Sequence, residues 1–233
     1  MTSALSLDTL QAGLRQSLPI VSGYVPVAIA FGVLATQAGL PPLGAVIISM
    51  LMYSGASQFL FIALLANGAS PWFAAALALL INLRHIVYGP SLAAELPRHP
   101  RLRWLSHGLT DEVFALSSAG LALQPREARI DWLTGVALGA WSSWVLGTAL
   151  GSLAGEWLTA RWPLMSDILP FALPALFLVL IAPRFTSRRW SAALIVAVMV
   201  GALFAVLDTP NLGLPIAALC GALVYLLGSR HAY

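Results

Sequence analysis

Arg84 and His85 are the residues whose types and surroundings point most clearly to chemistry. They follow a stretch, from Gln16 to Leu83, that contains no Asp, Glu, Lys, Arg or His. A cation at membrane depth costs about 2.5–3.5 kcal/mol even on a lenient insertion scale, so it needs an anionic partner or a water-filled cavity. We predict that Arg84 binds a substrate carboxylate through its guanidinium and that His85 relays a proton. The alternative is that Arg84 extends to the membrane interface and anchors a helix end.

The residues around this pair favour a polar helix face followed by a break. At helical spacing, Asn82 and Tyr88 each share a face with His85. Asn82 and Tyr88 are therefore predicted to contact the substrate. Gly89 and Pro90 come next and are expected to break or kink the helix, which would free backbone carbonyls for binding.

A second polar cluster lies in the run from Ser54 to Phe59, which begins with small residues. Small residues allow close helix contact, whereas Gln58 brings four hydrogen-bonding positions into a dry interior. One interpretation is a local break at Gly55 that presents backbone groups, Ser57 and Gln58 to a substrate. The other is a helix–helix contact with one interhelical hydrogen bond, and the residues favour neither.

Two acids follow Thr110 at the start of a later apolar segment. In the first turn of a helix capped by Thr110, Asp111 and Glu112 would be favoured by the helix dipole alone. If they enter the bundle instead, they could pair with Arg84, carry a coupled proton or bind the amino group of a substrate. Asp111 and Glu112 are therefore candidate proton-coupling residues together with His85.

Prolines within or near the spans are further candidates for broken helices. Pro26 and Pro174 each remove a helical hydrogen bond, and broken helices line many transporter sites. Ordinary kinks are the alternative, because proline is more frequent in membrane helices than in soluble ones. Six tryptophans are predicted to act mostly as anchors at the membrane interface: Trp132, Trp141, Trp144, Trp157, Trp162 and Trp190.

Membrane-spanning helices must position these residues. Hydrophobic residues make up 59% of the chain and charged residues 9%, whereas soluble domains carry about 25% charged residues. Apolar runs of about 20 residues predict helices, since strands would show alternating segments of about ten residues. We predict an all-α, polytopic transmembrane helical bundle that forms one domain over residues 1–233. Its apolar segments are 17–40, 43–66, 71–95, 105–123, 132–155, 165–183, 190–208 and 211–229.

The predicted number of crossings is seven or eight, and segment 105–123 decides between them. If this segment does not cross and the N-terminus lies outside, every loop arginine except Arg15 and Arg161 is cytoplasmic, as the positive-inside rule favours. A faint internal repeat aligns residues 25–28 with residues 173–176. It would place a site where the two halves meet, but chance similarity between apolar sequences is the alternative.

Charge and cysteine content exclude several classes of site. The net charge is only +3 and the arginines lie in short loops, so they indicate membrane topology rather than a nucleic-acid surface. Cys220 is the only cysteine and can form neither an intramolecular disulfide nor a cysteine-based metal site. We expect no metal and no cofactor.

Five groups of residues occur in a fixed order along nearly the whole chain: Gly23, Pro26 and Phe31-Gly32; Ser54 to Phe59; Asn82 to His85 with Tyr88-Gly89; Leu109 to Phe114; and Asp167 to Phe177. Together they resemble the AzlC family of branched-chain amino-acid permeases. The resemblance implies an exporter of branched-chain amino acids in the bacterial cytoplasmic membrane. It also implies a partner, a small AzlD-type membrane subunit.

The predicted function is secondary transport: export of branched-chain or similar small apolar amino acids, driven most simply by the proton gradient. The sequence has no Walker motif for nucleotide binding, and we do not expect an enzyme. An intramembrane hydrolase is one alternative, with Ser54 or Ser57 beside His85 as nucleophile and base, although the spacing matches no hydrolase elbow. A channel or a structural membrane subunit is the other alternative.

Overall fold

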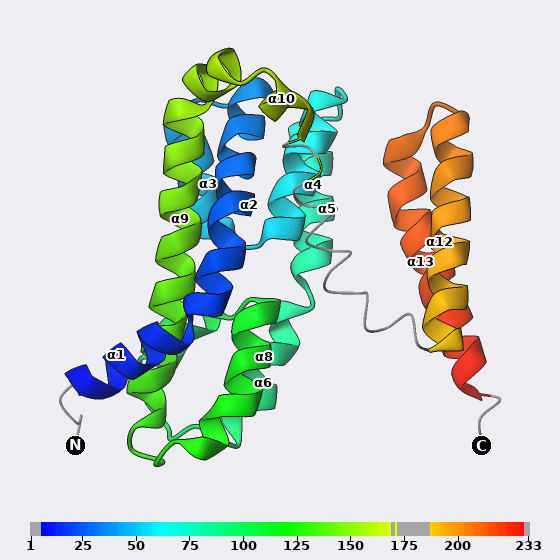
Figure 1. Ribbon diagram of the computed structural model, residues 1–233. Helices are drawn as coiled ribbons and strands as arrows, with labels where there is room; N and C mark the ends of the chain where they lie inside the picture. Colours follow the sequence, from blue (N-terminus) through cyan, green and yellow to red (C-terminus); the bar gives the residue numbers. More distant parts are fainter. Residues whose placement is uncertain (1–5, 169–170, 172–186, 231–233) are drawn as a thin grey trace. The chain divides into compact units, whose positions relative to one another are not determined.

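The computed structural model describes residues 6–168, 171 and 187–230, and their regular structure is helical throughout. The chain divides into two compact units between Leu173 and Pro174. The first unit contains α1 (Leu7–Gln16), α2 (Leu18–Gln37), α3 (Pro42–Met52), α4 (Gly55–Ala66), α5 (Pro71–Asn82), α6 (His85–Ala93), α7 (Leu102–Leu105), η1 (Ser106–Gly108), α8 (Asp111–Gly120), η2 (Leu121–Leu123), α9 (Arg129–Arg161) and α10 (Leu164–Ile168) (Figure 1). The second contains α12 (Arg188–Val206) and α13 (Pro210–Arg230).

Helices α2 and α9 form the core of the first unit, and they pack in parallel along a face of small residues. A Cβ atom on Gly151 would lie 2.1 Å from the carbonyl oxygen of Ile29, and one on Gly32 would lie 2.3 Å from that of Thr148. Further towards the start of α9, Gly135 meets α1 at the carbonyl of Leu10 in the same way. Without side chains between them, the backbones approach closely and gain dispersion contacts, which drive helix association in lipid.

Helices α3 and α4 double back on one another instead of forming one span. Gln58 Nε2 donates to the carbonyl oxygen of Ile48 at 3.3 Å, although a continuous helix would separate residues ten apart by about 15 Å. The break consists of Tyr53, with φ of 25°, and Ser54, which is extended. In Figure 1, α3 descends to the middle of the unit and α4 returns to the end where α3 began.

Helices α7 and α8 form a second hairpin that enters from the opposite end. Arg101, just before α7, pairs with Asp131 near the start of α9, and a Cβ on Gly120, at the end of α8, would lie 2.7 Å from the Trp132 ring. Both ends of this hairpin therefore lie beside the start of α9. Its tip reaches the tip of the first hairpin, where His107 Nε2 lies 2.9 Å from the carbonyl oxygen of Met50.

Helices α5 and α6 together form one span with a break at Leu83 and Arg84. The turn is tight, since Ile86 N–H donates to Leu83 and Val87 N–H donates to Arg84, three residues back in each case. Helix α5 lies against α4, and α6 lies against α8. The span therefore links the two hairpins, and its break falls where their tips meet.

Four described segments are long and apolar enough to cross a membrane: Leu18–Gln37, Pro71–Ala93, Arg129–Arg161 and Arg188–Val206. Segment 43–66 was predicted to cross as one span, and this prediction is wrong because a buried break at its centre turns the chain back. Segment 105–123 is likewise interrupted at Leu109-Thr110, between η1 and α8. Most of segment 165–183, and the repeat residues 173–176 with Pro174, lie outside the described residues.

The hairpins also change the expected placement of arginines. Helix α1 packs on the start of α9, where a Cβ on Gly13 would meet the carbonyl of Trp132. Arg15, at the end of α1, therefore lies at the same end of the first unit as Arg101, whereas Arg161 ends α9 at the other. The seven-crossing arrangement put Arg15 opposite the arginine-rich loops, and this placement is wrong because segment 43–66 doubles back. The total number of crossings stays a prediction.

The second unit is a pair of helices joined by a short turn. A Cβ on Gly213 of α13 would lie 2.4 Å from the Cβ of Phe204 on α12. At the other end of the pair, the rings of Trp190 and Tyr225 lie 4.9 Å apart. The two helices are thus antiparallel and pack through small residues in the way that α2 and α9 do.

The glycine face of α9 provides a test of this packing. We expect Gly151→Ala to destabilise the protein by about 1–3 kcal/mol or more, because its Cβ would overlap the Ile29 backbone. Gly23→Ala on α2 is the control, since a Cβ there meets nothing within 4 Å. The measurement is the thermal unfolding midpoint of the detergent-solubilised protein. Equal midpoints for the two variants would contradict the close approach of α2 and α9.

Candidate functional site

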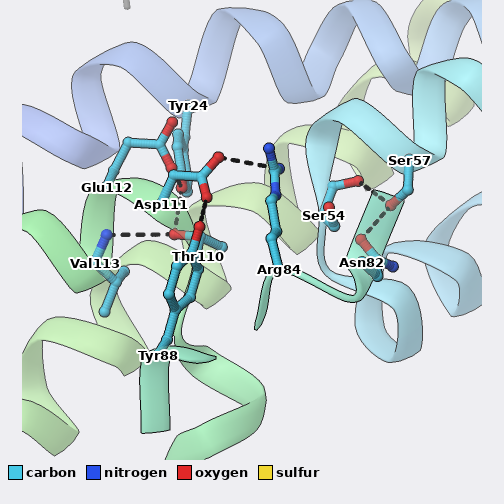
Figure 2. A network of polar contacts seen from close by, with 10 residues as sticks. All are labelled: Tyr24, Ser54, Ser57, Asn82, Arg84, Tyr88, Thr110, Asp111, Glu112 and Val113. Atoms are coloured by element: carbon cyan, nitrogen blue, oxygen red, sulfur yellow. Dashed lines mark hydrogen bonds and ion pairs between the residues drawn. The ribbon is translucent and has the colours of Figure 1, made fainter. Parts of the chain in front are cut away.

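Three breaks in the helices meet at the centre of the first unit: Tyr53-Ser54, Leu83-Arg84 and Leu109-Thr110. Hydrogen bonds and an ion pair connect them. Ser57 Oγ donates to Asn82 Oδ1 at 3.0 Å, which ties the first break to the second. Arg84 Nη2 lies 3.0 Å from Asp111 Oδ2, which ties the second to the third. We refer to this meeting point as the junction (Figure 2).

Arg84 and Asp111 form the charged pair of the junction. Tyr88 donates its hydroxyl to the other oxygen of Asp111, and the Tyr88 ring stacks on Phe114 with centroids 4.6 Å apart. Of the three roles considered for the two acids, pairing with Arg84 is the one that Asp111 forms in the structure, and proton coupling stays a prediction. The side chains of Arg84 and Asp111 are 37% and 31% exposed, so the pair is partly buried and the acid balances the cation.

Glu112 has a different environment from its neighbour. Its carboxylate accepts a hydrogen bond from the Tyr24 hydroxyl, and Tyr24 also bonds Thr110 Oγ1 at 2.7 Å. No cation pairs with Glu112 among the described residues, whose salt bridges involve other acids. Tyr24 was not predicted from the sequence, although a buried tyrosine in an apolar span needs a partner for its hydroxyl.

The cap predicted at Thr110 is confirmed as well. The Thr110 hydroxyl accepts from the backbone N–H of Val113 at 3.3 Å. Capping and entry into the bundle were treated as alternatives for Asp111 and Glu112, but the structure combines them. Helix α8 starts at the junction. Its first-turn acids therefore lie at the positive end of the helix dipole and also contact other helices of the unit.

Gln58 belongs to the wall of the first hairpin. It is fully buried, and its Oε1 accepts from Trp144 Nε1 at 2.9 Å while its Nε2 bonds Ile48. Ser49 adds a 2.7 Å hydrogen bond to Thr148 on the same side. Both polar ends of Gln58 are thus occupied: Nε2 ties α4 to α3 within the hairpin, and Oε1 ties the hairpin to α9.

The buried tryptophans correct another prediction. Trp132 and Trp144 were expected at the membrane interface, but their exposed fractions are 0% and 2%. Trp144 packs edge-on against Tyr24 at 5.1 Å, and the Trp132 ring fills the space at Gly120. Trp157 and Trp162 are exposed, as an interfacial position requires. Tryptophan type alone could not distinguish these positions, because burial depends on which face of α9 meets α2 and α8.

The predicted broken-helix positions are only partly correct. Gly55 is the first residue of α4, directly after the break at Tyr53-Ser54. Gly89 and Pro90 lie within α6, and Pro26 lies within α2, without interrupting either helix. A single proline removes one backbone hydrogen bond, which a membrane helix tolerates when neighbouring helices surround it.

His85 lies at the start of α6 with its ring 5.3 Å from that of Tyr88. Its Nε2 is buried and has no hydrogen-bond partner in the described part of the chain, and the same holds for Arg84 Nε and Ser54 Oγ. The serine–histidine contact that a hydrolase would need is therefore not formed, since Ser57 is bonded to Asn82. No cluster of three or more His, Cys, Asp or Glu side chains that could hold a metal occurs among the described residues.

Comparison with known proteins identifies the family. The family model described as AzlC protein matches residues 19–158, which include both hairpins and every residue of the junction. This chain belongs to the AzlC family. An inner membrane protein of Escherichia coli (strain K12), YgaZ, is 41% identical over 91% of this chain and 86% of its own length.

Other AzlC-family relatives support the membrane location. An uncharacterized membrane protein of Archaeoglobus fulgidus is 40% identical over 91% of this chain and 92% of its own length. The branched-chain amino acid transport protein AzlC of Bacillus subtilis (strain 168) is 25% identical over 74% of this chain and 66% of its own length. No solved structure matches this chain. The family assignment thus rests on the sequence, and the arrangement of the junction rests on the present structure.

The Arg84–Asp111 pair can be tested by a double-mutant cycle on stability. We expect Asp111→Asn and Arg84→Ala each to lower the thermal unfolding midpoint, because each leaves a charge or a buried polar group unpaired. The double variant should lose less than the sum, by about 0.5–3 kcal/mol. Glu95→Gln is the control, since the Glu95 side chain is 49% exposed against 31% for Asp111, and a pair with an exposed carboxylate should contribute little. Strict additivity would show that Arg84 and Asp111 are not coupled.

Proposed function

We propose that this AzlC-family protein is a secondary transporter that exports branched-chain or similar small apolar amino acids across the bacterial cytoplasmic membrane. The observation that carries the proposal is the junction, where three helix breaks and a charged pair meet inside a bundle of apolar helices. Substrate sites of secondary transporters typically lie at such discontinuous helices near the middle of the membrane. The name of the Bacillus subtilis relative supports an amino-acid substrate.

The distribution of arginines supports an orientation. Arg15, Arg101 and Arg129 belong to one end of the first unit, and Arg161 to the other. By the positive-inside rule, the arginine-rich end faces the cytoplasm. The hairpin of α7 and α8 would then enter from the cytoplasmic side and that of α3 and α4 from outside, so that each hairpin borders one route to the junction.

The charges at the junction support proton coupling through Glu112. Asp111 is balanced by Arg84, whereas Glu112 accepts a hydrogen bond from the Tyr24 hydroxyl and pairs with no cation among the described residues. An ionised Glu112 can bind the ammonium group of an amino acid arriving from the cytoplasm. A proton arriving from outside neutralises Glu112 and releases that ammonium group. Because substrate and proton compete for one carboxylate, inward proton flow drives outward transport.

Transport in proteoliposomes tests this coupling. We expect the wild-type protein, reconstituted with the proposed small subunit, to exchange L-leucine and to move it faster when a pH gradient is imposed. Glu112→Gln should lose that stimulation at least about fivefold, the range of a typical coupling energy. Glu156→Gln, at an exposed acid on α9, is the control and should respond like the wild type. An unchanged pH response in Glu112→Gln would assign proton coupling to another group or to none.

We also propose that export requires a small AzlD-type membrane subunit, following the family resemblance. The glycines of α9 pack against α1 and α2 within this chain, so the partner must use another surface. We expect little export by the purified chain alone and full export when the small subunit is reconstituted with it. The measurement is L-leucine flux per folded molecule, and full flux from the chain alone would remove the requirement.

A further inference from the structure

Helices α4 and α8 both begin at the junction, each directly after the tip of a hairpin. Their N-termini differ in whether the chain itself supplies a cap and an acid. At α8 the Thr110 hydroxyl caps the helix, and the acids Asp111 and Glu112 occupy its first turn. At α4 the residue in the capping position is Ser54, which makes no capping hydrogen bond, and the first turn has no acid. The positive end of the α8 dipole is therefore neutralised within the chain, and that of α4 is not.

The start of α4 leaves hydrogen-bond donors open; Ser54 and Ser57 are buried there, and Gly55 and Ala56 are partly exposed. The backbone N–H groups of Gly55, Ala56 and Ser57 have no acceptor among the described residues, since the first helical bond is donated by Gln58 to Ser54. The side chain of Ser54 is also unpartnered at Oγ, and the residue is only 3% exposed. Buried helix ends without partners are rare, and unmade hydrogen bonds of this kind destabilise a protein. Both observations indicate a ligand that accepts hydrogen bonds.

We propose that the N-terminus of α4 binds the carboxylate group of the transported amino acid. The N–H groups of residues 55–57 and the Ser54 hydroxyl donate to its oxygens, as helix N-termini do to anions elsewhere. This inference rests on the proposed transport function and identifies the part of the junction that recognises the substrate's α-carboxylate.

Arg84 has a supporting place in this site. The Ser57–Asn82 hydrogen bond brings the start of α4 to within two residues of Arg84, and Figure 2 shows Arg84 between Asp111 and the end of α4 that carries Ser54. The guanidinium is already paired with Asp111, but its Nε is buried and without a partner in the described region. The α4 N-terminus, with no anion of its own, thus supplies the uncompensated positive potential, and Arg84 Nε can add one donor.

This arrangement recognises the backbone of an amino acid and not its side chain. Backbone N–H groups and one hydroxyl bind a carboxylate whatever group the α-carbon carries. Amino acids with different apolar side chains should therefore share the site, whereas molecules without a free carboxylate should not bind. L-Leucinamide keeps the side chain and the ammonium group of L-leucine and lacks only the carboxylate charge.

Ser54→Asp is the decisive variant. Aspartate is a good capping residue, so it should fold at least as well as the wild type while its own carboxylate occupies the substrate's place. We expect it to lose L-leucine exchange, and Ser54→Ala to bind L-leucine roughly tenfold more weakly through loss of one hydrogen bond to a charged group. Ser70→Asp is the matched control, because Ser70 caps α5 at an exposed loop and should leave exchange unchanged.

The measurements are L-leucine exchange in proteoliposomes, with the small subunit present, and competition by L-leucinamide. Loss of exchange in a folded Ser54→Asp protein, together with no competition by L-leucinamide, is the expected result. Wild-type exchange in Ser54→Asp, or equal competition by L-leucinamide, would overturn the carboxylate site while leaving the transport function intact. If the wild-type protein exchanged no amino acid, the proposed function would fall and this inference with it.

Discussion

Lipid cannot hydrogen-bond to the backbone, and this constraint governs the rest of the structure. A chain that turns back at Tyr53-Ser54 and again at Leu109-Thr110 leaves N–H and C=O groups outside the helical hydrogen-bond pattern at each turn. Such breaks are possible only where other helices enclose them. In this protein the breaks enclose one another: the tip of each hairpin meets the other through His107 and the Met50 carbonyl. Because each break needs other helices around it, the three breaks lie together, and so do the polar side chains next to them.

The parallel contact of α2 and α9 makes this enclosure possible. Glycines at the contact let the backbones touch, which leaves the remaining faces of α9 free to hold the hairpins. Thr148 and Trp144 of α9 hydrogen-bond Ser49 and Gln58 of the first hairpin. The polar residues at the hairpin tips thus divide into two groups. Gln58 fixes the hairpin to its support, while Ser54 and Glu112 keep polar atoms that are available to a ligand.

The balance of charge at the junction follows from these positions. A cation and two acids meet there, and the geometry pairs Arg84 with Asp111 while Tyr24 hydrogen-bonds Glu112. A zwitterionic amino acid carries one charge of each sign. The open N-terminus of α4 and the unpaired Glu112 offer one complementary charge for each, so the junction can accept such a molecule without leaving a buried charge unmatched.

The sequence by itself determined the membrane class, the helical fold, the family and several residues of the junction, among them Arg84 and Asp111 but not Tyr24. These follow from local properties: the length of apolar runs, the rarity of a charge such as Arg84 inside them, and the order of short motifs. Only the tertiary structure decided that segment 43–66 turns back, that Trp144 is buried, and that Asp111 pairs with Arg84 while Glu112 does not. An apolar run of this length is compatible with a full span and with a hairpin. The choice between them depends on which distant helices cover the break, and that information is in the packing of α9 against α1, α2 and α3.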